Sequence, residues 1–473
     1  MPLSKQRMLL RIATCAQDWQ LLLIWRLVWP QMMMFLCTTV INLTDTWVAG
    51  KISSDVQASM GLAFQVQMFL MVFAASLGAG GLASVSQSMG AGNSKRARNF
   101  AGLVLSAAFS IALLLTCLLF AWRTPVLRIL QTPEMILPLA DYILRFMLLG
   151  FPFACVMQVG GTLFRAARHV TAPLVVMLAA CAINLAGDLL FGLGMGGFPR
   201  LGMRGIIWST LAANILGAAM TVAILKRGGM LPPFLLPPLA WGRKAFSYLL
   251  SVSVPALGNG VMWQTGYLVL YGLAASLPDG VAALAGLTAG NRVESMLYMP
   301  AAAFMATASI LVGNALGHGD KPAAKKAGLV LFVLSGTIIG SAAAVIWPFI
   351  SDLARIFSHD AAVQWQIRKY LFYNVLAAPL TVSGLVLHGV LNGAGATVYS
   401  MLVNIAGIWI VRLPMAWLLS ARVFHNAEGL YAAMLLSIAA QTAIIIWIFL
   451  RRDWYAFSLK SKYSKRTLPT EKD

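Results

Sequence analysis

Long apolar runs alternate with short polar turns along the whole chain. A helix that crosses the roughly 30 Å hydrocarbon core of a bilayer needs about 20 mostly apolar residues, and twelve runs reach that length. They lie near residues 26–49, 56–82, 99–121, 136–160, 171–194, 204–225, 246–272, 281–313, 327–350, 366–390, 397–420 and 428–450. The pattern predicts an all-α integral membrane protein with twelve transmembrane helices.

One polar turn occurs twice, about half the chain apart. Gly90, Gly92, Asn93 and the run AGLVL at 101–105 recur as Gly317, Gly319, Asp320 and AGLVL at 327–331. Each copy lies between two apolar runs. The repeat therefore indicates a doubled membrane architecture and not a solenoid of short units.

A proline-rich stretch separates the two halves. Residues 226–244 contain four prolines, which exclude a continuous helix there. We therefore expect an interfacial lead-in at 1–25, an amino-terminal six-helix lobe at 26–225, a cytoplasmic linker at 226–245, a carboxyl-terminal six-helix lobe at 246–450 and a basic cytoplasmic tail at 451–473.

Composition and charge agree with a membrane protein. Hydrophobic residues make up 59% of the chain and charged residues 11%, which is too little polar surface to cover a soluble globule of this length. Lys and Arg gather in alternate loops, so the positive-inside rule predicts that both termini are cytoplasmic. The net charge of +20 then faces anionic lipid headgroups. Nucleic-acid binding is the weaker interpretation, because no basic stripe interleaved with aromatics is long enough to form a soluble domain.

The five cysteines are scattered singly and form no CxxC pair. They suggest neither a disulfide framework nor a zinc site. We expect no cofactor.

Charged residues inside apolar runs are the candidates for function, since an ionised side chain is costly there. Asp45 and Asp188 each lie about six residues before the outer end of a predicted helix, and Thr210 lies about six residues past the outer start of the next. At 1.5 Å per residue all three lie roughly 9 Å below the outer surface. Asn184 precedes Asp188 by four residues and shares its helix face.

These four residues suit a small cation. Two carboxylates in a poorly hydrated pocket disfavour the doubly ionised form, so the pair can carry protons. The same oxygens, with the Asn184 amide and the Thr210 hydroxyl, are alternatively ligands for Na⁺, a hard cation. The alternative, in which the two carboxylates have no role in ion binding, is that Asp45 and Asp188 are helix-end residues that face interfacial water.

The chain resembles the multidrug and toxic compound extrusion (MATE) family of secondary transporters. The resemblance covers residues 26–450, with Pro30 before Asp45, the run LTDTWVAG, the helix end SVSQSMGAGN, the Asn184 and Asp188 pair and the doubled lobes. It implies two six-helix lobes related by a pseudo-two-fold axis along the membrane normal. It also implies exchange of an inward cation for an outward, usually cationic and amphiphilic, substrate.

The resemblance places an ion-coupling site at Asp45, Asn184, Asp188 and Thr210, with H⁺ or Na⁺ as the coupling ion and protons preferred. The carboxyl-lobe site of the sodium-coupled branch does not transfer. The expected helix after Pro255 has no acidic residue, and Tyr370 is followed by Asn374 where the family has Asp. Coupling is therefore expected in the amino lobe, as in the DinF-like branch.

Other polar or aromatic positions are weaker candidates for substrate contact or gating: Pro30, Met262, Trp263, Arg292, Glu294 and Tyr298. Arg292 and Glu294 are two residues apart and so lie on different helix faces. We expect Arg412, inside an apolar run, to pair with carbonyls or carboxylates.

Three classes of function fit such a chain to different degrees. The first is a cation-coupled antiporter, not an enzyme, that exports lipophilic cations; it would be a monomer in the inner membrane, in contact with anionic lipids at the cytoplasmic face. A flippase for a lipid or lipid-linked sugar shares the architecture, but it would need a cluster of cavity Arg or Lys. An acyl- or prenyltransferase needs a catalytic histidine with a partner, or paired aspartate motifs, and the only histidine within a predicted helix is the isolated His388.

Overall fold

The computed structural model describes residues 3–233 and 237–463, with side chains placed from residue 21 to 461 except at 239–240 and 296–297. The middle of the predicted linker, 234–236, and the end of the predicted basic tail, 464–473, lie outside the described residues. Twelve helices of the described part are long and apolar enough to cross a membrane. The predicted number of transmembrane helices is therefore confirmed.

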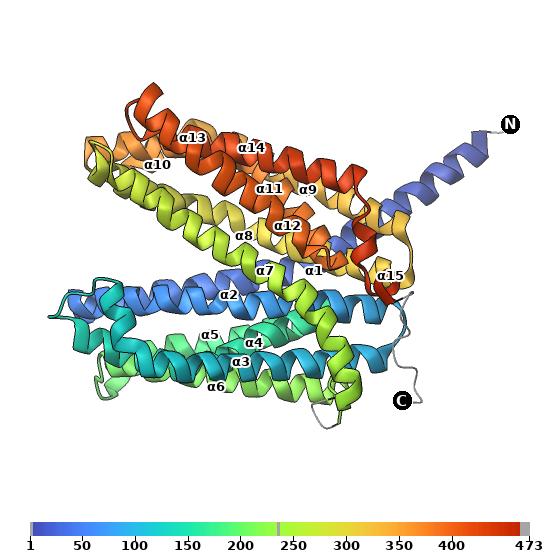
Figure 1. The fold of residues 1–473 in the computed structure, drawn as a ribbon, viewed down its shortest axis with the longest axis horizontal. Helices are drawn as coiled ribbons and strands as arrows, with labels where there is room; N and C mark the ends of the chain where they lie inside the picture. Colours follow the sequence, from blue (N-terminus) through green and yellow to red (C-terminus); the bar gives the residue numbers. More distant parts are fainter. Residues whose placement is uncertain (1–2, 234–236, 464–473) are drawn as a thin grey trace.

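The first six spans form one lobe of the molecule (Figure 1). They are α1 (Leu3–Ile52), α2 (Ser54–Gly90), α3 (Ser94–Ile129), α4 (Leu137–Ala166), α5 (Thr171–Gly187) with a π-helical continuation η1 (Asp188–Gly192), and α6 (Met203–Arg227). A short 3₁₀ turn, η2 (Met195–Gly197), lies between η1 and α6.

The other six spans form the second lobe. They are α7 (Leu239–Ala275), α8 (Gly280–His318), α9 (Lys321–Ile346) continued through η3 (Trp347–Phe349) and α10 (Ile350–Phe357), α11 (Ala361–Ala394), α12 (Thr397–Ile405) continued through η4 (Ala406–Arg412), α13 (Leu413–Leu418) and η5 (Leu419–Val423), and α14 (Glu428–Arg451). After the last span come η6 (Trp454–Phe457) and α15 (Leu459–Tyr463).

The helix that contains the first span begins before the predicted span. α1 is one helix from Leu3 onward and continues through Pro30, so the predicted lead-in joins the span without a break. No glycine or proline interrupts residues 3–25, so the backbone has no reason to leave the helix there. Likewise α7 begins at Leu239, directly after the last proline of the linker.

The repeated polar turn has the same geometry in both lobes. Asn93 caps α3 by accepting the Arg96 amide at 2.8 Å, and Asp320 caps α9 by accepting the Ala323 amide at 2.9 Å. A side-chain oxygen at this position satisfies an amide that the first helical turn leaves unpaired. The two copies of the sequence therefore build the same helix–turn–helix corner.

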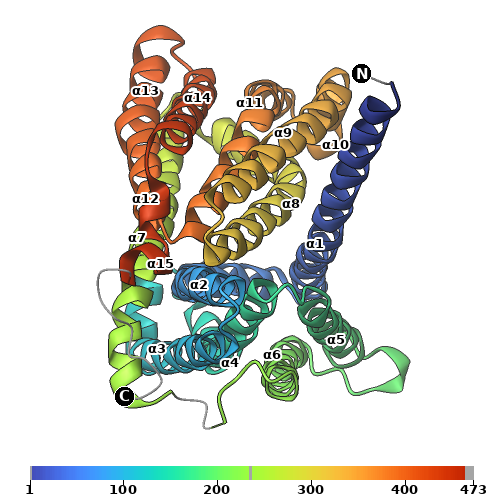
Figure 2. The same cartoon turned by 90° about the vertical axis from the view of Figure 1, so that its right-hand side faces the viewer.

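In each lobe, the start of the first helix packs against the core of the other lobe. Ile24 and Val28 of α1 pack into the core of the carboxyl lobe, whereas Leu249 and Val252 of α7 pack into the core of the amino lobe. The crossing is reciprocal, as a pseudo-two-fold relation between the lobes requires. End-on, in Figure 2, the two bundles lie one above the other with α1 rising beside the carboxyl lobe.

The lobes meet at one end of the molecule and diverge toward the other (Figure 1). We call the end where the lobes meet the basic end; it carries the α2–α3 and α8–α9 turns and α15. There the backbone of Gly90 in α2 lies against that of Asn314 in α8, and the backbone of Gly317 lies against that of Gln87. The absence of a side chain at both glycines permits this close backbone approach.

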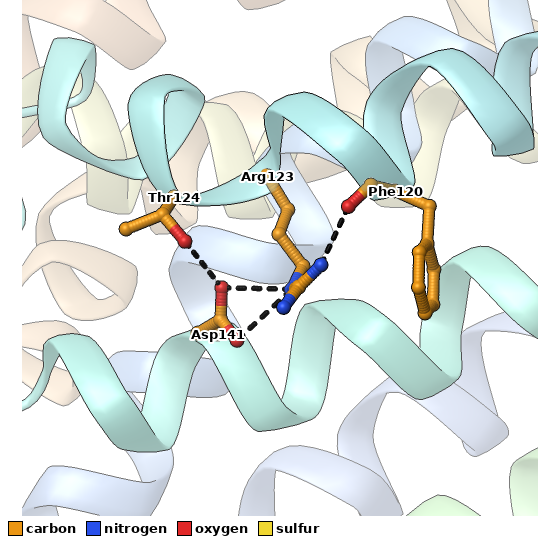
Figure 3. A network of polar contacts seen from close by, with 4 residues as sticks. All are labelled: Phe120, Arg123, Thr124 and Asp141. Atoms are coloured by element: carbon orange, nitrogen blue, oxygen red, sulfur yellow. Dashed lines mark hydrogen bonds and ion pairs between the residues drawn. The ribbon is translucent and has the colours of Figure 1, made fainter.

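A polar network ties α3 to α4 at the other end of the amino lobe (Figure 3). The Arg123 Nε atom lies 3.0 Å from both carboxylate oxygens of Asp141, and Thr124 Oγ1 donates to Asp141 at 2.9 Å. Arg123 also donates to the Phe120 carbonyl. The network satisfies these charges within the lobe, away from the groups described next.

Candidate functional site

Asp188 lies where α5 changes from α-helical to π-helical winding. Its side chain is fully buried, and the Ser209 hydroxyl on α6 donates to Asp188 Oδ1. A methyl group at Gly187 would overlap Ser209, so a glycine at that position lets α6 approach the carboxylate. π-Helical turns occur often at functional sites because they displace a side chain from the regular helix face.

The other predicted residues of the amino lobe gather around Asp188. The Asn184 Nδ2 atom donates to Thr210 Oγ1 at 3.1 Å, and the Asp45 carboxyl of α1 lies against both Asp188 and Asn184. Helices α1, α5 and α6 thus bring Asp45, Asn184, Asp188 and Thr210 together. The sequence places Asp45, Asp188 and Thr210 at the same depth in the membrane, and from this shared depth we expect that they can meet.

Three oxygens of this cluster are buried without a hydrogen-bond partner. They are Asp45 Oδ1, Asn184 Oδ1 and Asp188 Oδ2. A buried acceptor left unpaired costs about 1–3 kcal/mol, so their convergence needs an explanation. Protons on the carboxyls, or a cation that prefers oxygen ligands, would satisfy all three.

Ser209 is a member of this cluster that the sequence analysis missed. It is adjacent to Thr210 and looks like an ordinary small residue in a helix–helix contact. Only its distance from Asp188 across the α5–α6 contact reveals a role. Among the described residues, no group of three or more His, Cys, Asp or Glu side chains could hold a metal ion.

Glu294, a candidate from the sequence, is a buried carboxylate of the carboxyl lobe. It lies on α8 and accepts hydrogen bonds from Tyr298 at 2.7 Å and from the Tyr370 hydroxyl. It does not occupy either of the two family positions, in helices 7 and 10, at which this chain lacks an acidic residue. This lobe contains a partly open cavity of about 390 Å³ that Glu294 and Tyr298 line, together with Trp263 and Arg412.

The remaining candidates are dispersed. Arg292 is exposed on a different face of α8 from Glu294, as their spacing of two predicts. Met262 contributes its carbonyl, which accepts the Trp409 indole at 3.3 Å. Pro30 is buried within α1, next to Gln31, whose amide donates to Thr307 of α8 at 3.0 Å.

Arg412 is buried, as predicted, and its charge interacts with the Glu294 carboxyl across the cavity. Its hydrogen bonds go to hydroxyl groups, since Nε donates to Ser437 at 2.8 Å and the guanidinium also bonds to Tyr267.

Comparison with known proteins supports this architecture. A family model, MatE, matches residues 30–190 and 255–418, one segment in each lobe. The probable multidrug resistance protein NorM of Thermotoga maritima is 27% identical over 87% of this chain and 88% of its own length. A protein of Shewanella oneidensis named FAD transporter is 24% identical over 83% of this chain and 86% of its own.

Solved structures show the same fold. The Vibrio cholerae MATE transporter VcmN in its bent form superposes with a TM-score of 0.85 at 20% identity, covering 93% of this chain and 98% of that one. The matched family segments together span more than half of the chain. The protein is therefore a multi-pass membrane protein of the MatE family, a multidrug and toxic compound efflux transporter and not an enzyme.

Proposed function

We propose that the protein is a cation-coupled antiporter, in which Asp45, Asn184, Asp188 and Thr210 bind the coupling ion. The observation that carries this proposal is the set of three unpaired oxygens on Asp45, Asn184 and Asp188. Buried acceptors of this kind are satisfied when the ion is bound and unsatisfied when it leaves. The free energy of the site thus depends on the ion, as coupling requires.

The direction of transport follows from charge. If the basic end faces the cytoplasm, as the positive-inside rule indicates, the lobes diverge toward the outside. The ion site then lies in the outer half of the amino lobe, where an ion enters down its gradient. Opening of the contact at the basic end, with closure of the lobes at the opposite end, would release the ion inside and accept substrate for export.

Protons are the preferred coupling ion. The cluster offers two carboxylates, one amide oxygen and one hydroxyl from the predicted residues, and the Ser209 hydroxyl already donates to Asp188. Three buried oxygens of the cluster lack a hydrogen-bond partner, which is few for Na⁺, whereas two neighbouring carboxyls share a proton readily.

The substrates are proposed to be amphiphilic, mostly cationic small molecules. The naming of one relative as an FAD transporter keeps anionic substrates as a second candidate, and a lipid flippase as a third. A flippase is disfavoured because Arg412 is the single arginine that lines the carboxyl-lobe cavity, whereas a lipid phosphate would need a cluster of cations.

The test is ethidium transport by the purified protein in liposomes, driven in turn by an imposed pH gradient and an imposed Na⁺ gradient. We expect uptake or release to follow the pH gradient and to stop when a protonophore collapses it. Transport driven by Na⁺ alone would assign the other ion. No gradient-driven transport of several cationic dyes would refute the antiporter and make lipid-linked substrates the next to test.

A further inference from the structure

A segment near the end of the chain crosses the seam between the two lobes. After α14 the chain turns back as η6, and α15 begins at Leu459. Both elements lie at the basic end, where the two bundles meet (Figure 2). We call residues 454–459 the clasp segment, because its two ends are buried in different lobes.

The first end of the clasp segment is anchored in the carboxyl lobe. The Trp454 side chain is fully buried in the core of that lobe, and its indole N–H donates to the Phe449 carbonyl of α14 at 3.1 Å. The Phe457 ring lies 5.3 Å from the ring of Tyr399 on α12. Large aromatic side chains contribute much of the packing energy where they are buried, so this end is held firmly.

The second end is anchored in the amino lobe by fewer contacts. Leu459 is 1% exposed and belongs to the buried cluster that forms the core of that lobe. Its amide donates to Gln87 Oε1 of α2 at 2.7 Å. The next two residues, Lys460 and Ser461, are exposed. The attachment to the amino lobe therefore rests mainly on one leucine side chain and one hydrogen bond.

One residue, Ser458, separates the two anchors. Its backbone is extended, with φ −66° and ψ 151°. Consecutive Cα atoms are about 3.8 Å apart, so the Cα atoms of Phe457 and Leu459 are at most about 7 Å apart. A single residue that is already extended has little length to give. If the lobes separate at the basic end, one of the two anchors must therefore leave its lobe.

A cavity beside the second anchor gives it room to leave. An open cavity of about 490 Å³ is lined by Leu459 and Lys460, together with Arg96 of the amino lobe and His318 of the carboxyl lobe. Leu459 lies at the wall of this cavity, so it can withdraw without displacing a transmembrane helix. Lys460 and Arg96 line the same space with like charges, which opposes a permanent attachment.

We propose that residues 454–459 act as a clasp, which holds the lobes together at the basic end and releases from the amino lobe when that end opens. Trp454 stays in the carboxyl lobe, and Leu459 leaves its place beside Gln87. Release exposes the leucine side chain and leaves the Gln87 oxygen without its partner, so it costs free energy. The clasp thus favours the conformation in which the basic end is closed. This device needs neither a particular coupling ion nor a particular substrate.

The test measures how often the basic end opens in the detergent-solubilised, full-length protein. The reporter is Ser86→Cys in a background without other cysteines, because Ser86 of α2 is fully buried and its hydroxyl lies against Gly313 of α8. A water-soluble maleimide reaches this position only when the two helices part. When opening and closing are fast, the alkylation rate is proportional to the open fraction, however small that fraction is.

Leu459→Ser should release the clasp. Burial of one leucine side chain is enough to change a two-state ratio about tenfold, so alkylation should be about tenfold faster than in the parent. Leu459→Met keeps an apolar side chain of similar volume and should react like the parent. Ala456→Ser places the same serine at an exposed position of the clasp segment and is the matched control. Equal rates in Leu459→Ser and Ala456→Ser would overturn the proposal.

A second measurement identifies the anchor that leaves. In Leu459→Ser, one spin label is placed at Ser461 and the other at Arg98 of α3 or Lys325 of α9, which are exposed residues at equivalent positions of the two lobes, 227 apart. Electron–electron double resonance should give a longer and broader Ser461–Arg98 distance than in Ala456→Ser, with the Ser461–Lys325 distance unchanged. The reverse pattern, or no change in either pair, would contradict release from the amino lobe.

The result is separable from the antiport test, because both measurements need no gradient and no substrate. A protein that fails to move dyes but shows the tenfold rise would keep the clasp and lose the antiporter. Gradient-driven transport with no effect of Leu459→Ser would have the opposite meaning.

Discussion

Gln87 and Asn314 are equivalent residues of the two lobes, 227 positions apart, and each donates its side-chain amide to a backbone carbonyl of the opposite lobe. Gln87 of α2 donates to Gly393 at 2.9 Å, and Asn314 of α8 donates to Ala166 at 3.5 Å. Gly393 and Ala166 are themselves 227 positions apart, near the ends of α11 and α4. The lobes are thus joined at the basic end by a symmetric pair of bonds.

Removing one of these amides should weaken the closed contact at the basic end. Gln87 also accepts the Leu459 amide at 2.7 Å, so Gln87→Ala leaves buried groups unpaired at a cost of about 1–3 kcal/mol. A shift of 1.4 kcal/mol changes a two-state population about tenfold. Spin labels at Ser54 and Ser276, near the ends where the lobes diverge, should therefore report shorter distances by electron–electron double resonance in a cysteine-free background.

Asn314→Ala should act in the same direction, and the exposed Gln65→Ala on α2 is the control. Distance distributions that match that control in both variants would show that these amides do not hold the lobes together.

A methyl group between the lobes should have a similar effect by steric means. Gly317→Ala would place its Cβ against the backbone of Gln87 and Ala91, where neither side can yield by rotating a side chain. Overpacking of this kind costs about 1–3 kcal/mol. Gly61→Ala on α2 has open space around the new methyl group and serves as the control. The same spin labels should shorten in Gly317→Ala only; identical traces would argue against a close contact at this point.

Asp188→Asn should abolish ion-driven efflux without unfolding the protein. The amide is nearly the same size and still accepts from Ser209, but it can neither release a proton nor supply a negative charge to a cation. Dye transport in liposomes, with expression and size-exclusion profile as checks on folding, measures the outcome.

Asp141→Asn is the matched control for that experiment. Its carboxylate lies in the same lobe but is satisfied by Arg123 and Thr124 (Figure 3), and partly exposed ion pairs contribute little, about 0–1 kcal/mol. It should transport normally. Normal coupled transport by well-expressed Asp188→Asn would remove the ion site from this position.

Tyr370→Phe should destabilise the carboxyl lobe, because it removes one of the two hydroxyls that donate to the buried Glu294 carboxyl. The loss of a hydrogen bond to a charged group costs about 1.5–3 kcal/mol. Thermal unfolding in detergent should occur at a lower temperature than for the wild type. Tyr142→Phe, whose ring packs on Phe146 in the amino lobe, is the control, and equal midpoints for the two variants would contradict the assignment.

The sequence by itself determined the membrane class, the number of spans and the doubled plan. These properties depend on the length of apolar runs and on local turn chemistry, such as the Asn93 and Asp320 caps, and both are written along the chain. It also identified Asp45, Asn184, Asp188 and Thr210 as candidates for an ion site, because a charged residue inside an apolar run stands out without any knowledge of its neighbours.

The tertiary structure alone decided which polar groups meet across helices. Ser209 looks ordinary until α6 packs on Gly187, and Glu294 becomes part of a site only when α11 brings Tyr370 to it. The exchange of α1 and α7 between the lobes is likewise invisible in the hydropathy pattern. The physical reason is that every transmembrane helix satisfies its own backbone, so the sequence fixes each helix separately. Which faces then contact one another depends on packing between small residues far apart in the chain.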